Sequence, residues 1–186
     1  PALYKLPFNV LTDFAPVAMV GYSPHLLVVS TKIPANSTSE LVAYAKAQNG
    51  KVNFAAAAGM GSAAHLAGVI FAQRAGIQWG YVPYKGGAQA MTDLIGGQVN
   101  MFSADFAVML PQVKGGKVRG LAVTSSQRSK SIPELPTVNE ALGLKDYELI
   151  AYFAVFAPAG TPADIIQKLN KAINTAAGNK EILERF

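Results

Sequence analysis

The sequence has no cysteine among its 186 residues and only one tryptophan. Without cysteine the protein forms no disulfides, and it has neither thiolate ligands for a metal nor a thiol nucleophile. Charged residues are also few, at 15%, whereas hydrophobic residues reach 51%, and this balance excludes a disordered chain. No apolar run reaches the roughly 18 residues that a transmembrane helix needs, so we predict no membrane span.

Several patterns of known chemistry are missing as well. The sequence contains no phosphate-binding P-loop, no zinc-protease motif and no Gly-x-Ser-x-Gly elbow. His25 has no second ligand at metal spacing, so we expect no metal and no cofactor. Sixteen Lys and Arg against eleven Asp and Glu give a net charge of +5, which suits anionic small molecules as well as nucleic acid. No basic run with interleaved aromatics appears, so we do not expect nucleic acid as a partner.

What is present is a repeated alternation of short apolar stretches and amphipathic segments, separated by glycine turns. Four such alternations predict an α/β fold with a mainly parallel sheet covered by helices on both faces. The predicted strands are 52–57, 79–83, 99–103 and 118–124, and the helices are 41–48, 63–74, 88–95, 106–114 and 138–142.

Two longer extended segments bracket this alternation. Residues 14–30 read as two stretches with a break near residues 22–24, and residues 147–157 read as a long strand. A last amphipathic helix over 163–177 follows, with Thr161 as its expected cap. Bracketing of this kind is expected when a chain enters and leaves an inserted lobe through two neighbouring strands, which is a hinge geometry.

The loops that follow the predicted strands are the candidate binding elements, because ligands of such sheets sit outside the carboxyl ends of the strands. In the loop Ala58-Gly59-Met60-Gly61-Ser62, glycines allow close backbone approach, and the helix that follows attracts anions with its amino end. A carboxylate would fit there. The alternative reading is that the glycines only form a tight turn and Ser62 only caps the helix.

The two other loops are weaker candidates. Lys85 could attract an anion, although surface lysines are usually solvated. Ser103 and Asp105 end a predicted strand, and we expect Asp105 to cap the following helix. A carboxylate facing a ligand there would repel an anion unless it accepted a hydrogen bond from a hydroxyl or amine.

Ser62 and His65 are three residues apart on a predicted helix, a spacing that would allow nucleophilic catalysis. No nearby acidic residue is placed to orient the imidazole, so we expect His65 to be a partly buried, hydrogen-bonded histidine. An enzyme that uses this pair stays open as a less favoured reading.

Seven strings of the sequence, in order, resemble segments of the tripartite tricarboxylate transporter receptor family, the Bug-type periplasmic solute-binding proteins. The strings are PALYKLPFNVLTDFAPVAMV, IPANSTSELVAYAK, NFAAAAGMGSAAHLAG, VPYKGGAQAMTDLIGGQVN, LPQVKGGKVRGLAVTSSQRS, IPELPTVNEALGL and APAGTPADIIQKLN.

The resemblance implies a type II periplasmic-binding-protein-like fold of two lobes that close on a carboxylate. It implies a non-catalytic periplasmic protein that delivers its ligand to membrane transporter subunits. By the same resemblance we expect the chain to lack the first third and the extreme C-terminus of family members. Residues 21–148 would be one complete lobe, and 1–20 and 149–186 would be remnants of the other lobe with the hinge strands.

Some positions depart from the family pattern that the resemblance supplies. Ala57 and Ala58 stand where relatives have serines, Ser62 stands for a threonine, and His65 is retained. Ala104 replaces an acidic residue, Asp105 an asparagine, and Tyr152 a tryptophan. We therefore expect a ligand with a carboxylate and an apolar or aromatic body. The expected ligand-binding residues are Tyr22, Ala58, Gly59, Met60, Gly61, Ser62, Ser103, Asp105 and Tyr152, with His65 and Lys85 in a second tier.

Two further expectations accompany this reading. The alternative function is a metabolite-sensing effector domain of a transcriptional regulator, since similar two-lobed domains serve that role. We also expect apolar faces near residues 15–20 and 150–157 to be exposed, and copies of the chain to associate through them.

Overall fold

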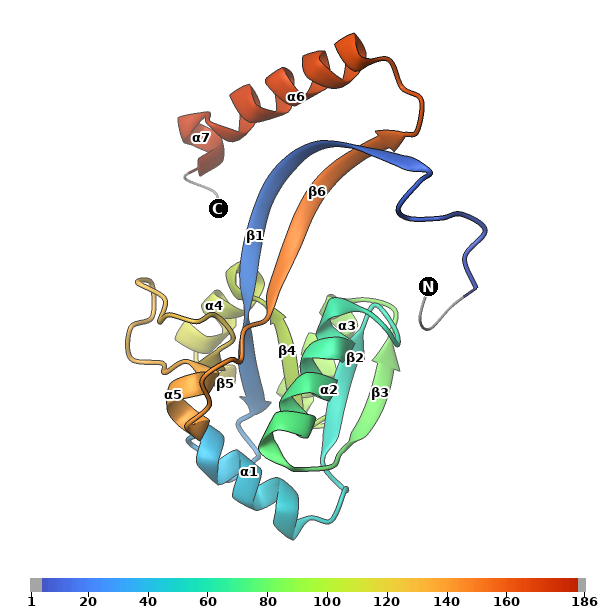
Figure 1. Ribbon diagram of the computed structural model, residues 1–186. Coiled ribbons are helices and arrows are strands. Elements are labelled where there is room, and N and C mark those ends of the chain that lie inside the picture. Colours follow the sequence, from blue (N-terminus) through green and yellow to red (C-terminus); the bar gives the residue numbers. More distant parts are fainter. Residues whose placement is uncertain (1–4, 184–186) are drawn as a thin grey trace. The chain divides into compact units, whose positions relative to one another are not determined.

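The computed structural model describes residues 5–183 and divides the chain into two compact units. One comprises Ser23–Ala151 and is called the sheet unit here. The other comprises Pro1–Tyr22 with Tyr152–Phe186 and is called the ribbon unit. Strands β1 and β6 contribute residues to both units (Figure 1).

Five strands of the sheet unit pair in the order β3-β2-β4-β1-β5. Strand β2 is parallel to both β3 and β4, whereas β1 is antiparallel to β4 and β5. Four strands therefore point one way and β1 runs against them. The strands are β1 (Phe14–Ser30), β2 (Asn53–Ala57), β3 (Gly80–Tyr84), β4 (Met101–Asp105) and β5 (Val118–Val123).

Helices cover both faces of this sheet, as the sequence predicts (Figure 1). Successive residues of β1 point to opposite faces, since strand side chains alternate. Leu27 and Val29 join the apolar cluster that includes α1, α2 and α5, and Leu26 and Val28 join the cluster of α3 and α4. The helices are α1 (Thr38–Ala47), α2 (Ala63–Ala75), α3 (Gly87–Gly96), α4 (Phe106–Lys114) and α5 (Val138–Leu142).

The α/β class is confirmed, and three details of the prediction are corrected. The sheet is mixed, because apolar alternation predicts strands without encoding their direction. Residues 14–30 form one strand with no break at 22–24; its irregularity is a register shift at Leu27/Val28. Thr161 does not cap α6, since Pro162 takes the cap position and the Thr161 hydroxyl donates to the Pro158 carbonyl at 2.7 Å.

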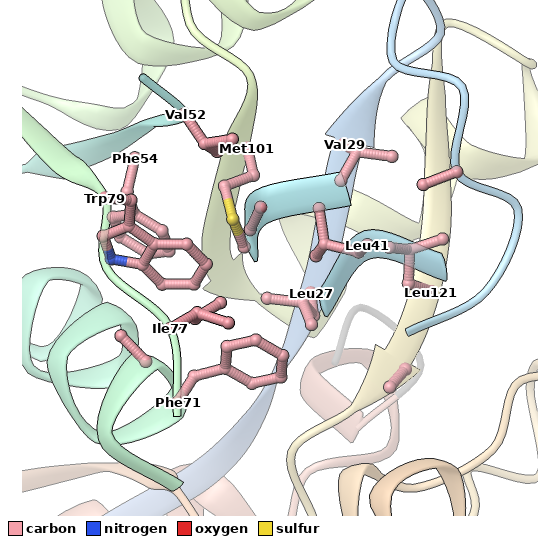
Figure 2. Packing of buried hydrophobic residues seen from close by; sticks show 14 of the residues in the cluster. Leu27, Val29, Leu41, Val52, Phe54, Phe71, Ile77, Trp79, Met101 and Leu121 are labelled. Atoms are coloured by element: carbon pink, nitrogen blue, oxygen red, sulfur yellow. The ribbon is translucent and has the colours of Figure 1, made fainter. Parts of the chain in front are cut away.

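Stacked aromatic rings fill the core between α2 and the sheet (Figure 2). The Trp79 ring lies 5.3 Å from that of Phe54 and 5.6 Å from that of Phe71, with both pairs stacked. Gly68 of α2 lies directly over Phe54, and a Cβ atom there would lie 2.7 Å from the phenyl ring. The helix approaches the strand this closely because position 68 has no side chain.

The ribbon unit is built from the outer parts of β1 and β6 (Ile150–Pro158), followed by α6 (Ala163–Ala177) and α7 (Lys180–Leu183). β6 pairs with β1, and the two strands run side by side in Figure 1. The Asn170 side chain ties α6 to the ribbon by donating to the Val17 carbonyl at 2.6 Å. No residue of α6 is buried. The expected exposure of the apolar segments is confirmed, with Met19 55% and Phe156 57% exposed.

Within residues 5–183, no helix has both the length and the apolar character that crossing a membrane requires.

We expect Gly68→Ala to lower the free energy of unfolding by about 1 to 3 kcal/mol, because the added methyl overpacks the Phe54 ring. Gly96→Ala in α3 is the matched control, since its added Cβ would meet no atom closer than 4.0 Å. Denaturant unfolding of both variants measures the difference. Equal stability of the two variants would mean that the core yields at Phe54 without cost.

We also expect copies of the chain to associate through α6. Its half-buried positions are Ile166, Asn170, Ile173 and Ala177, and a second apolar stripe at the same spacing is exposed, consisting of Ile165, Leu169, Ala172 and Ala176. This 4-3-4 spacing is that of a helix-pairing seam. In an antiparallel pair of α6 helices, the large residues of one stripe lie opposite the alanines of the other.

Light scattering at increasing protein concentration tests this association. The double variant Ile165→Glu/Leu169→Glu should lower the average mass, because charge on the stripe opposes its burial. Lys168→Glu, on the same helix, should leave the mass unchanged. A mass of one chain for the unmodified protein at every concentration would contradict the expectation.

Candidate functional site

The carboxyl edge of the sheet unit gathers the candidate loops. Ala57 pairs with Tyr84, and Phe54 and Ala55 pair with Met101 and Phe102, so β2, β3 and β4 end at the same edge. The amino ends of α2, α3 and α4 follow directly from these three strands. Because each helix amino end carries unpaired N–H groups and partial positive charge, this edge suits an anion.

The glycine loop after β2 is a tight turn in the left-handed region. Ala58, Gly59 and Gly61 have φ values of 60°, 82° and 89°. The Gly59 N–H donates to the Tyr84 carbonyl at 3.1 Å, which ties the loop to the end of β3. The Gly61 N–H donates to His65 Nδ1 at 3.0 Å. The amides of both glycines are therefore occupied inside the loop, and their role is to shape it.

The Ser62 hydroxyl is likewise engaged within the loop. It donates to the Ala57 carbonyl at 2.6 Å and accepts from the His65 N–H at 3.2 Å, so Ser62 caps α2. His65 is 7% exposed and hydrogen-bonded, as predicted. Because its Nδ1 accepts from Gly61 and the hydroxyl proton points to Ala57, the pair lacks the geometry of a nucleophile with its base.

The amides that follow Ser62 are the donors that the geometry leaves for a ligand. In the described part of the chain, the N–H groups of Ala63 and Ala64 form no hydrogen bond. Helices α3 and α4 begin at the same edge without a side-chain cap, at Gly86 and Asp105. Sequence reasoning named the glycines and missed Ala63 and Ala64, although their position directly after the cap residue indicates them.

A buried polar cluster lies beside this edge, at the point where β1 passes β4 and β5. His25 is 2% exposed, with Nδ1 3.3 Å from Ser103 Oγ and Nε2 3.8 Å from Asp105 Oδ1. Its backbone N–H donates to Thr124 Oγ1 at 2.7 Å, and that hydroxyl donates to the Leu149 carbonyl at 2.7 Å. Burial lowers the pKa of His25 below its ordinary value, although the Asp105 charge acts in the opposite direction.

Asp105 differs from its expected role. It occupies the cap position of α4, but its side chain makes no capping hydrogen bond. One carboxylate oxygen faces His25 and has no hydrogen-bond partner among residues 5–183, while the side chain as a whole is 41% exposed. Strand pairing with β1 brings His25 directly opposite Asp105, and one carboxylate oxygen lies toward this histidine while the side chain makes no capping hydrogen bond.

The remaining predicted residues come from both units, and all of them are exposed. Lys85 follows β3 directly and is exposed. Tyr22 and Tyr152 belong to the ribbon unit and are 70% and 67% exposed. Met60 lies in the glycine loop and is 43% exposed.

A hollow of about 350 Å³ lies at the opposite edge, lined by residues at the carboxyl ends of α1 and α2, among them Lys46, Asn49 and Gly76. Helix carboxyl ends carry partial negative charge, so this hollow suits an anion less well than the edge that carries the glycine loop. Residues 5–183 contain no group of three side chains able to hold a metal ion.

The sequence profile described as "Tripartite tricarboxylate transporter family receptor" matches residues 1–186. The chain belongs to this receptor family. Protein BugT of Bordetella pertussis is 40% identical over 182 residues, covering 98% of this chain and 55% of that protein. A UPF0065 protein of Agrobacterium vitis is 37% identical over the full 186 residues. The chain spans about half the length of the curated relatives it matches.

Solved receptors share the fold. MatC from Rhodopseudomonas palustris with bound malate superposes with a TM-score of 0.90 at 30% identity, covering 98% of this chain and 61% of that one. The R. palustris protein Rpa4515 with adipate superposes with a TM-score of 0.88 at 32% identity, covering 96% of this chain and 59% of that one. The periplasmic binding protein BugD superposes with a TM-score of 0.85 at 35% identity, covering 92% of this chain and 57% of that one. The periplasmic-binding-protein-like fold expected of this receptor chain is confirmed.

We expect this receptor chain to lose stability as the pH falls below the ordinary histidine pKa of 6.5. Burial depresses the pKa of His25 in the folded protein, so the unfolded chain binds protons first and acid favours unfolding. The contribution of neutral His25 to the free energy of unfolding is fully present above pH 6.5. It is lost as the pH falls from 6.5 through the lower pKa of His25 in the folded protein.

Thermal unfolding at several pH values between neutral and mildly acidic tests this expectation. His25→Gln should lose less stability over this pH range than the unmodified protein does. His65→Asn is the comparison variant, because burial also lowers the pKa of His65. A His25 pKa above 6.5 by NMR titration would mean that attraction to Asp105 outweighs burial.

Proposed function

We propose that the chain is part of a periplasmic solute-binding protein that holds a small carboxylate-bearing metabolite without transforming it and delivers it to a tripartite tricarboxylate-type transporter. The observation that carries this proposal is the convergence of three helix amino ends at one sheet edge, with the Ala63 and Ala64 amides unpaired there. The malate and adipate bound to the related structures support the ligand class.

The carboxylate would accept hydrogen bonds from the Ala63 and Ala64 amides, at the amino end of α2. Each charge-assisted hydrogen bond contributes about 1.5 to 3 kcal/mol, so two of them correspond to a Kd on the order of millimolar. Closure of a second lobe on the ligand would add the remaining affinity, and Tyr22 and Tyr152 are proposed as further ligand contacts. The proposed two-lobe arrangement places 21–148 in one lobe and the flanking segments in the other.

The ligand body is proposed to be apolar or aromatic near the glycine loop. Ala58 and Met60 present apolar surface there, and the loop hydroxyl of Ser62 is already engaged. Asp105 would exclude a second negative charge close to it and would accept a hydrogen bond from a ligand hydroxyl or amine. Ser103, which contacts His25, supports this side of the site.

Titration of the isotope-labelled chain with adipate and malate, followed by NMR, tests the proposal. We expect amide shifts to concentrate at residues 60–64 and 85–88, because the ligand carboxylate binds at these helix amino ends. Adipamide, which lacks charge, is the control ligand and should leave these amides unmoved. Phenylacetate, which joins one carboxylate to an aromatic ring, tests the proposed ligand body. Amide shifts equal to or greater than those with malate support an aromatic ligand.

Lys85→Ala should weaken binding by up to about fivefold, since an exposed charge contributes about 0.2 to 1 kcal/mol. Lys46→Ala, beside the hollow at the other edge, is the matched control and should change nothing. Shifts that spread over surface lysines, or that appear equally with adipamide, would overturn the assignment of the site. Turnover of any ligand during the titration would overturn the non-catalytic role.

A further inference from the structure

His65 is held beside the glycine loop in one defined protonation state. Its Nδ1 lies 3.0 Å from the Gly61 N–H, and because a backbone N–H can only donate, Nδ1 accepts. The proton of the neutral ring is therefore on Nε2. The Tyr81 ring contacts the imidazole edge-to-face, with centroids 4.8 Å apart and planes at 70°, which fixes the ring orientation.

The hydrogen bond from Gly61 closes the loop onto the first turn of α2. Ser62 reinforces the closure, since its hydroxyl joins the His65 N–H to the Ala57 carbonyl. Glycine adopts positive and negative φ with similar ease, so the hydrogen bond to His65 helps to select the φ of 89° from the conformations open to Gly61. The unpaired amides of Ala63 and Ala64 follow directly, so the same contacts fix the backbone that carries them.

We infer that His65, in its neutral Nε2–H form, is a positioning residue of the anion-binding loop: by accepting from Gly61 it orders the turn that presents the Ala63 and Ala64 amides. The inference rests on the proposed function for its ligand. The hydrogen bond itself can be measured on the ligand-free protein.

Protonation of Nδ1 would remove the lone pair that accepts from Gly61, so the order of the loop should follow the charge of His65. Burial lowers the pKa of His65 and so favours the neutral, accepting form. On α2 itself, the charged Arg74 lies in the last turn and pairs with Asp146 at 2.9 Å.

The strands packed near the imidazole bring few titratable groups. β2 carries none. β3 brings Tyr81, which contacts the ring, and Tyr84, whose hydroxyl donates to Asp93 at 2.8 Å. β4 brings Asp105, which lies beside His25. Burial raises the pKa of both tyrosines, so neither ionises in the range where His65 titrates.

Two variants separate positioning from mere packing. His65→Asn places an amide oxygen near the position of Nδ1, so it keeps an acceptor for Gly61 but does not titrate. His65→Leu removes the acceptor and keeps a side chain of similar bulk. Thermal unfolding of both variants reports whether each remains folded.

The first measurement is NMR of the ligand-free 186-residue protein. We expect the Nε2–H tautomer at neutral pH, and a Gly61 amide resonance that moves with the titration of His65. In His65→Asn this resonance should not respond to pH in that range. Hydrogen exchange at Gly61, whose amide loses its acceptor, should be faster in His65→Leu than in the unmodified protein, and unchanged in His65→Asn. An Nδ1–H tautomer, or exchange unaffected by His65→Leu, would overturn the inference.

The second measurement is adipate titration at neutral pH. His65→Leu should bind about three- to tenfold more weakly, the effect of losing one hydrogen bond, and His65→Asn should bind like the unmodified protein. Equal binding by His65→Leu would overturn the positioning role while the proposed function stands. Failure of the unmodified protein to bind adipate or malate would overturn the proposed function, and tautomer and exchange would then decide the role of His65 by themselves.

Discussion

The parallel pairing of β2 with β3 and β4 determines where every group of the candidate site lies. Parallel strands end at one edge, so the helices that follow them begin there, and their unpaired amides share one small region. A hydrogen bond between Gly59 and the end of β3 locks the first loop to this edge. If one strand ran the other way, its helix would begin at the opposite edge and the positive ends would no longer converge.

This arrangement explains why a binding site can be built with little side-chain chemistry. The loop between β2 and α2 uses its hydroxyl, its imidazole and both glycine amides to hold its own shape. Amides directly after the cap residue then remain for an anion. In the proposed site these backbone donors would bind the carboxylate, and the residues around the loop would select the ligand body.

The same edge also carries a feature that opposes anions. Asp105 keeps a buried oxygen near His25, and the lowered pKa of that histidine means that it does not neutralise the carboxylate at neutral pH. The negatively charged Asp105 ends β4, the strand that pairs with β1. The glycine loop follows β2 and Lys85 follows β3, on the other side of β4 in the sheet. The field along the edge is therefore polarised, which suits a ligand with a carboxylate at one end and a hydroxyl or amine at the other.

The sequence by itself determined helices α1 to α6, the cap at Ser62, the α/β class and the family, because local periodicity, capping residues and ordered motifs are all readable along the chain. Tertiary structure decided the direction of β1, the pairing of His25 with Asp105 and the capture of the Gly61 amide by His65. Strand direction leaves no trace in apolar alternation, and Asp105 looks like a cap until β1 brings a histidine 80 residues away in sequence against it. Which amides remain for a ligand depends on where every other donor finds its acceptor, and only the folded chain settles that.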